Sequence, residues 1–313
     1  MQPCSICGNA DGNRVHEATE RMLGFGGRFH YLECGACGCL QLLDPPSDLG
    51  RYYPKDYYSF NPGHSTGPVS AIKDAVARRA INYRMTGRGL LGRWVVGRTG
   101  AFAWMRSDAW RWNARILDIG CGNGSLLRDL HRYGFRHLTG ADPFIAADIA
   151  FAPGCIIRRT DVQGITGPFD LVMLNHAFEH MPDPLATLKR IRELLAPGGH
   201  AMIRIPVAGS WAWEHYGTNW VQLDAPRHFF LHTDRSMRRL VEAADLAWVA
   251  AINDSSEFQF TGSETYLKGL RLGDGRLRFT ERELRRFKQR AAVLNKEGRG
   301  DTSTYYLCRP MNG

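Results

Sequence analysis

A strand that ends in an acid and runs into alternating glycines constrains this chain more than any other feature of its sequence. The segment reads ILDIGCGNGS and contains, in order, Asp118, Gly120, Gly122 and Gly124. Glycines allow positive φ angles and a close approach of a ligand to the backbone, and a following helix adds its free N–H groups. A dinucleotide fingerprint needs one more glycine at position 125, which is Ser125 here. The segment therefore predicts a loop that binds a nucleoside other than a dinucleotide.

The residues after this loop continue a βαβ pattern. Apolar residues recur at helical spacing up to Gly134, and a second predicted strand at 137–141 ends at Asp142. An acid at the tip of the second strand is positioned to accept hydrogen bonds from both ribose hydroxyls. The alternative for Asp142 is a solvated turn before Pro143.

The rest of the chain alternates between apolar strands and amphipathic helices. Further strands are predicted at 156–158, 169–174, 200–205, 247–253 and 303–308, with helices at 184–195 and 235–244. The continuous apolar run 169–174 is typical of a central parallel strand that is buried on both faces. With the two strands beside the glycine loop, seven strands predict an α/β fold with a doubly wound, Rossmann-like sheet.

The glycine loop and residues 169–206, FDLVMLNHAFEHMPDPLATLKRIRELLAPGGHAMIRIP, resemble motifs of class I S-adenosylmethionine-dependent methyltransferases of the type 11/12 kind. The resemblance implies S-adenosylmethionine as cofactor and an antiparallel last strand. It also implies a set of residues that bind this cofactor. They are Asp118, Gly120, Cys121, Gly122, Gly124, Asp142, Pro143, Asp161, Val162, Asn175 and His176. For Asp161, which would face the adenine amino group, a plain exposed loop acid is an equal alternative.

Two C-x-x-C-G knuckles lie near the start of the chain, separated by 26 residues. Their cysteines are Cys4, Cys7, Cys34 and Cys37. Two such knuckles direct four thiolates to one point, and each following glycine supplies a left-handed turn. The spacing predicts a zinc ribbon with a structural role, because four thiolates leave no open position on the metal. The alternative is a pair of unrelated turns with reduced cysteines.

A zinc ribbon, the tyrosine-rich segment 44–60 and a methyltransferase core together resemble bacterial methyltransferases of nucleotide sugars and polysaccharides. The resemblance implies that a tyrosine near position 57 reaches the substrate, and that a histidine after the fifth strand is a general base. His228 matches that histidine. Two departures are Arg227, where those enzymes tend to have glutamate, and the single α/β domain. O-methylation and C-methylation therefore both stay open.

Three histidines are candidates for a catalytic base, because an imidazole titrates near neutral pH. His228 is preferred on the resemblance, and His176 follows because it comes directly after the fourth strand, where ligands bind in open α/β sheets. For His180, helix capping or core packing is the stronger alternative. A group of aromatic residues would form an acceptor wall or pack against the sheet. These are Trp211, Trp213, Tyr216 and Trp220.

Length and composition place the chain among globular proteins. Its length of 313 residues exceeds the common size of a single domain. We expect a zinc ribbon at 1–43, a tyrosine-rich and basic helical bridge at 44–114, and the methyltransferase domain at 115–313. A helical insertion at about 257–301 would serve as an interaction surface, a dimer contact or a lid. No stretch reaches the roughly 20 apolar residues that span a bilayer and no signal peptide is evident, so a cytoplasmic protein is expected.

Positive charge is concentrated in residues 73–115, where ten basic residues face two acids and carry +8 of the net charge of +9. The default interpretation is a solvated helical face. The alternatives are a site for a sugar diphosphate or a lipid-linked phosphate, and a contact with nucleic acid.

The sequence as a whole predicts a methyltransferase for a small, saccharide-type acceptor that can carry phosphate. An RNA base methyltransferase ranks below it, because residues 1–60 have a net charge of −2, a poor electrostatic footprint for RNA. A non-catalytic cofactor-binding scaffold ranks third, since both the glycines and the ribose acid are present. An oligomer is compatible with the sequence.

Overall fold

The computed structural model describes residues 2–53, 69–106 and 108–311. The predicted substrate tyrosines at 57 and 58 lie outside these residues. Within them, no helix combines the length and the apolar character needed to cross a bilayer.

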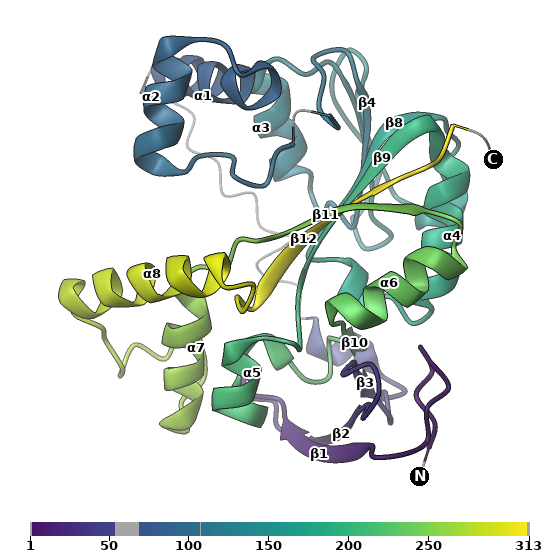
Figure 1. The fold of residues 1–313 in the computed structure, drawn as a ribbon, viewed down its shortest axis with the longest axis vertical. Coiled ribbons are helices and arrows are strands. Elements are labelled where there is room, and N and C mark those ends of the chain that lie inside the picture. Colours follow the sequence, from purple (N-terminus) through teal and green to yellow (C-terminus); the bar gives the residue numbers. More distant parts are fainter. Residues whose placement is uncertain (1, 54–68, 107, 312–313) are drawn as a thin grey trace.

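A mixed sheet of eight strands forms the centre of the molecule, in the order β11-β12-β9-β8-β4-β5-β7-β6 (Figure 1). Its strands are β4 (Arg115–Ile119), β5 (His137–Ala141), β6 (Ile149–Ala152), β7 (Cys155–Arg158), β8 (Phe169–Asn175), β9 (Leu195–Pro206), β11 (Ala247–Asn253) and β12 (Thr302–Cys308). The pairs among β4, β5, β7, β8 and β9 are parallel, whereas β12 is antiparallel to both β9 and β11. An antiparallel last strand agrees with the expectation.

The predicted count of seven strands is one too low. The additional strand is β6, which pairs antiparallel with β7 at the edge of the sheet. A tight turn joins these two strands, and Gly154 in that turn has a φ of +75°. A search for strands that alternate with helices overlooks such a hairpin, because no helix separates its strands.

Helices cover both faces of this sheet. One face carries α1 (Val69–Thr86) and α3 (Ser125–Tyr133), and the other carries α4 (Pro184–Leu194) and α6 (Asp234–Ala243). Successive residues of one strand point to opposite faces, so that Ile116 packs with the α1 and α3 side and Leu117 with the α4 and α6 side. Both residues are fully buried. The doubly wound arrangement predicted from the sequence is therefore present.

A second sheet of four strands, ordered β1-β2-β3-β10, joins distant parts of the chain. Three strands come from the first 43 residues: β1 (Arg14–Thr19), β2 (Arg28–Glu33) and β3 (Leu40–Leu42). The fourth, β10 (Phe230–Leu231), lies directly after the predicted catalytic residue His228 and pairs with β3. The cysteine-rich segment thus shares backbone hydrogen bonds with the segment that carries the candidate base.

Helices after β9 build a second core against this small sheet. They are α5 (Trp211–Tyr216), α7 (Phe258–Leu267) and α8 (Glu281–Lys296), whereas α2 (Leu90–Thr99) packs on α1. Phe260 of α7 stacks on Phe287 of α8, with ring centroids 5.1 Å apart. Trp213, Tyr216 and Trp220 are buried in the same core. Their burial corresponds to the packing alternative for these aromatic residues.

Candidate active site

The glycine loop follows β4 and has three residues in the left-handed region. Gly120, Gly122 and Gly124 have φ angles of +73°, +54° and +77°. A Cβ at position 120 would lie 2.6 Å from the Cβ of Ala177, and a Cβ at position 124 would lie 2.2 Å from the Cδ1 of Ile157. Only glycine satisfies both the backbone angle and the space at these two positions. The loop therefore packs closely against Ala177 and Ile157, and of its three glycines Gly120 is exposed whereas Gly122 and Gly124 are buried.

Asp142, at the tip of β5, connects to this loop through its carboxylate. Its Oδ2 accepts a hydrogen bond of 2.8 Å from the N–H of Gly122, and its Oδ1 accepts one of 2.9 Å from the N–H of Phe144. A carboxylate has about four lone-pair sites, so these two bonds leave capacity for hydroxyl donors of a ligand. The side chain is therefore held in place as an acceptor.

Asp118 and Asp142 are both buried, but the environment of Asp118 has a different effect on its carboxyl group. Burial, together with the negative charge of Asp142, raises the pKa of Asp118 from 3.8 to about 7. Its carboxyl group is consequently half protonated near neutral pH, and it can donate as well as accept a hydrogen bond.

A cavity of about 300 Å³ opens beside the loop and the tip of β5. Seven of the residues predicted from the sequence line it: Gly120, Asp142, Pro143, Asp161, Val162, His176 and His180. Its remaining lining is mainly apolar and includes Ile119, Phe144, Ala177 and Met181. An apolar slot with an anchored acid at its rim suits a flat, uncharged ring joined to a ribose.

The other predicted cofactor residues surround the cavity without lining it. Cys121 lies in the loop, and burial raises the pKa of its thiol. Asn175, at the end of β8, accepts a bond of 3.4 Å from Arg204. Asp161, which does line the cavity, is exposed and accepts bonds from the N–H groups of Gln163 and Gly164, so it also stabilises a local turn.

The three candidate bases come together around one carboxylate, that of Glu179. Glu179 lies in the short 3-10 helix η4 (Phe178–His180) and is fully buried. The Nδ1 of His176 is 3.4 Å and the Nε2 of His228 is 4.0 Å from its Oε1. The rings of His180 and His228 meet edge to face, with centroids 4.8 Å apart. Residues far apart in the sequence therefore form one cluster at the wall of the cavity.

The hydrogen bonds of the cluster define where its protons are. The Nδ1 of His228 lies 2.8 Å from the carbonyl of Gln222, and the Nδ1 of His180 lies 2.8 Å from the carbonyl of Arg227. Because a carbonyl only accepts, each Nδ1 carries the proton, and each neutral imidazole keeps a lone pair on Nε2. Burial, with a contribution from His180, lowers the pKa of His228 to about 4. His228 is therefore neutral at pH 7.

Glu179 remains an anion in spite of its burial. Burial by itself would raise its pKa, but the contact with His176 and the neighbouring His180 and His228 lower the pKa to about 2.

Arg227, the residue that departs from the sugar methyltransferase pattern, connects the cysteine-rich segment to the loop before β10. Its guanidinium is fully buried and donates to Asp224 at 2.6 and 2.9 Å and to Glu20 at 2.9 Å. Glu20 belongs to the cysteine-rich segment, directly after β1. The arginine thereby attaches that segment to the loop that carries His228.

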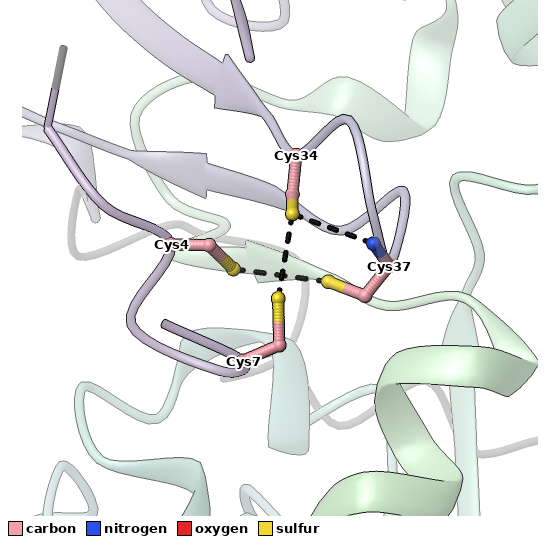
Figure 2. A group of neighbouring side chains, drawn as sticks. All are labelled: Cys4, Cys7, Cys34 and Cys37. Atoms are coloured by element: carbon pink, nitrogen blue, oxygen red, sulfur yellow. Dashed lines mark hydrogen bonds between the residues drawn. The ribbon is translucent and has the colours of Figure 1, made fainter. Parts of the chain in front are cut away.

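The four predicted metal ligands converge at one point (Figure 2). The Sγ atoms of Cys4 and Cys37 are 3.7 Å apart, and those of Cys7 and Cys34 are 3.5 Å apart. In a tetrahedral zinc site with Zn–S bonds of about 2.3 Å, neighbouring sulfurs are about 3.8 Å apart. All eight cysteines are free thiols, so these short distances are not disulfides. The donor set and its spacing fit a zinc ion.

Sequence reasoning missed three contributors to the site. Glu179 lies within the motif but was not predicted as a site residue, although a buried acid between two histidines is a signal that could have identified it. Tyr53, whose hydroxyl is 3.2 Å from the Nδ1 of His180, and Phe144 line the cavity. Tyr53 belongs to the tyrosine-rich segment 44–60 that the sequence singles out, whereas nothing in the local sequence distinguishes Phe144. The long-range fold brings both residues to the cavity.

These features define a doubly wound α/β protein with a glycine loop and an anchored acid beside an apolar cavity. A family model described as a methyltransferase domain matches residues 95–251, half of the chain. The chain therefore belongs to this methyltransferase family.

Curated relatives match a limited part of the chain. The trans-aconitate 2-methyltransferase of Deinococcus radiodurans is 32% identical over 98 residues, which cover 30% of this chain and 38% of that protein. A ubiquinone biosynthesis O-methyltransferase of Cereibacter sphaeroides is 39% identical over 95 residues, which cover 27% of this chain and 38% of that protein. This chain thus spans less than half the length of either relative.

Solved structures with a similar fold are more distant in sequence. An S-adenosylmethionine-dependent methyltransferase from Mesorhizobium loti is 18% identical and aligns with a TM-score of 0.43, covering 66% of this chain and 94% of that one. The cyclopropane synthase MmaA2 from Mycobacterium tuberculosis is 13% identical, also with a TM-score of 0.43, and covers 72% of this chain and 87% of that one.

Proposed function

We propose that this protein is an S-adenosylmethionine-dependent methyltransferase that acts on a small molecule of the saccharide class. The observation that carries the proposal is Asp142, which is anchored to the glycine loop by the N–H of Gly122 at the rim of an apolar cavity. Membership of the methyltransferase family supports the choice of this nucleoside over others.

The residues of the chain divide the binding of this cofactor among them. Asp142 would accept hydrogen bonds from the ribose hydroxyls, and the cavity beside Val162 would hold the adenine, with Asp161 at its edge. The backbone at Gly120, Gly122 and Gly124 and the carboxyl group of Asp118 would contact the methionine moiety. When bound, S-adenosylmethionine supplies a sulfonium methyl group to a nucleophilic atom of the acceptor.

The acceptor would lie against the histidine cluster, beside His176 and His180. His228 is the proposed general base, with His176 and His180 as the other candidates, because its unprotonated Nε2 can take a proton from a hydroxyl or carbon acid. The names of the relatives include an O-methyltransferase and a methyltransferase of an organic acid, which favours a small acceptor over a macromolecule. Methylation on oxygen and on carbon both fit this arrangement.

We also propose that Cys4, Cys7, Cys34 and Cys37 hold a structural zinc ion. The two halves of the site have the same internal bonds, because Gly8 donates to the carbonyl of Cys4 and Gly38 to that of Cys34, at 2.8 and 2.9 Å. Cys34 in addition accepts bonds of 3.4 Å from the N–H groups of Ala36 and Cys37, as a thiolate ligand does.

A labelling experiment tests the acceptor class. The full chain is incubated with methyl-labelled S-adenosylmethionine and either a cell metabolite extract or total RNA. We expect label in a saccharide-containing small-molecule fraction. Label in RNA alone would contradict the acceptor, and the absence of S-adenosylmethionine binding by calorimetry would contradict the proposed activity itself.

A further inference from the structure

The carboxylate of Glu179 is an unusual feature of the histidine cluster. It is fully buried, and neither of its side-chain oxygens has a hydrogen-bond partner among the residues that the structure describes. Leaving a buried ionised group without hydrogen bonds costs several kcal/mol. The nearest groups are the histidine nitrogens described above, at 3.4 Å or more. A group that binds between Glu179 and these nitrogens would satisfy the carboxylate.

The environment of His228 points to the same space. Its Nδ1 faces the carbonyl of Gln222, so Nε2 is the ring nitrogen available to a ligand, and Nε2 lies 4.0 Å from Oε1 of Glu179 and 3.8 Å from Oδ2 of Asp224. A cation bound at Nε2 would be attracted by both carboxylates. The positive group nearest to Asp224 is Arg227, which donates to both oxygens of that carboxylate.

The set of donors fits a divalent transition metal. One ring nitrogen each of His180 and His228 and one carboxylate oxygen of Glu179 all lie within 4.8 Å of one another. Metal-bound imidazoles usually donate their other N–H to a carbonyl or carboxylate, which fixes the tautomer and the ring. Both histidines already donate to backbone carbonyls in this way, to Arg227 and Gln222.

The geometry points to a second metal site, formed by Glu179, His180 and His228, for a first-row divalent cation such as Zn²⁺, Co²⁺ or Fe²⁺. Two imidazoles and one carboxylate occupy one side of such a cation and leave the other side open. His180 also lines the cofactor cavity, so the open side is next to the proposed acceptor space. The Cys4 cluster is a separate site with different, all-sulfur ligands.

The role of this cation, which rests on the proposed function, is to bind a hydroxyl of the acceptor. A metal-bound hydroxyl group loses its proton more readily than a free one. In an O-methylation the O–H bond breaks and its proton passes to water. The oxygen then bonds to the methyl carbon as the C–S bond of the sulfonium breaks. His228 is a ligand in this arrangement and not the base.

Cobalt binding tests the site without any assay of turnover. The protein is purified with zinc retained at its cysteines, and Co²⁺ is added during calorimetry and visible spectroscopy. We expect one equivalent of Co²⁺ and a d–d spectrum without the charge-transfer band of thiolate ligands. Glu179→Gln and His228→Gln should each weaken Co²⁺ binding by about 100-fold or more. Glu193→Gln, an exposed acid of α4 that pairs with Arg190, is the matched control and should bind normally.

The two proposals fail in different ways. Wild-type protein that binds S-adenosylmethionine but takes up no Co²⁺ beyond the cysteine site would overturn the metal site and leave the methyltransferase proposal intact. Turnover that survives complete removal of metal from the non-cysteine site, yet is lost in His228→Gln, would restore His228 as the base. Co²⁺ uptake without any binding of S-adenosylmethionine would contradict the proposed function alone. Melting temperatures of the variants identify any that are unfolded.

Discussion

Single residues of similar sequence context differ in this site because their neighbours in space differ. Asp118 and Asp142 both end or follow a strand, but Asp142 is bonded to two backbone N–H groups whereas burial dominates the environment of Asp118. The pattern of acids and glycines predicted both positions. It could not predict the protonation of Asp118, which depends on the atoms that surround it in three dimensions.

Replacing the anchored acid should weaken cofactor binding. Asp142→Ala removes the acceptor proposed for the ribose hydroxyls, and two hydrogen bonds to a charged group correspond to about 100-fold in affinity. Calorimetry with S-adenosylmethionine measures this change. Asp129→Ala, which removes a half-exposed acid of α3, serves as the control. Equal affinities of the two variants would reject the ribose assignment.

The stability of the protein should depend on pH through Asp118. Its pKa is about 7 in the folded protein and 3.8 ordinarily, so between these values the folded state binds more protons than the unfolded state. The free energy of unfolding therefore falls as the pH rises from about 4 to 7. The Asp118→Asn variant lacks this loss. Its free energy of unfolding should exceed that of the wild type by up to about 4 kcal/mol at pH 8 and differ little from it at pH 4. Urea unfolding at pH 4 and pH 8 measures these free energies. The same dependence on pH in the wild type and the variant would contradict the prediction.

At the level of elements, the sequence located most strands of the eight-stranded sheet and the helices α4 and α6 within one or two residues, whereas β9 begins at Leu195, five residues before the predicted strand 200–205. Strands 137–141 and 247–253 coincide with β5 and β11, because apolar runs and flanking turns are local signals. The hairpin strand β6 and the pairing of β10 with β3 were missed. Both depend on partners that the periodicity of one segment does not reveal.

The glycine loop and a surface helix offer a matched comparison of one substitution. Gly124→Ala introduces a Cβ 2.2 Å from Ile157 at a φ of +77°, and should lower the free energy of unfolding by about 2–4 kcal/mol. Gly97→Ala in α2 meets no atom within 4 Å and should instead raise it by up to about 1 kcal/mol. Chemical denaturation measures both. A free energy of unfolding of Gly124→Ala equal to or above that of the wild type would show that the loop tolerates a side chain.

The buried arginine that joins the cysteine-rich segment to the loop before β10 should be essential for stability. Glu20→Gln removes one charged partner of Arg227, and Arg227→Met leaves the carboxylates of Glu20 and Asp224 without it. Breaking a buried pair in this way costs about 3–5 kcal/mol. The exposed pair of Arg276 and Asp274 is the control, and Arg276→Met should change the melting temperature little. An unchanged melting temperature of Arg227→Met would contradict the role of the contact.

At the scale of the whole molecule, the cysteine cluster is coupled to the active site through shared elements. Its segment supplies β1, β2 and β3, and β3 pairs with β10 next to His228. The hydroxyl of the fully buried Tyr31 in β2 donates to the carbonyl of His228 at 2.8 Å. The folded structure of the cysteine-rich segment therefore influences the loop that holds this histidine.

Loss of the cysteine-bound metal should consequently reach beyond the knuckles. Cys34→Ser should remove one equivalent of zinc in metal analysis and increase amide hydrogen exchange in β1 to β3 and β10, because a structural zinc site contributes folding energy. Amide hydrogen exchange in β4 and β5 should stay unchanged. Cys308→Ser, in β12, is the matched control and should keep its zinc. Full zinc content in Cys34→Ser would contradict the assignment.

The sequence by itself determined the order of elements, the glycine loop, the acids at the strand ends and the two cysteine knuckles, because each depends on spacing within a short segment. Only the tertiary structure brought Glu179, His180 and His228 into one cluster, placed Arg227 between Glu20 and Asp224, and buried Asp118. Those features depend on contacts between residues up to about two hundred positions apart. The physical reason is that burial and charge interactions are set by neighbours in space, which a local pattern does not specify.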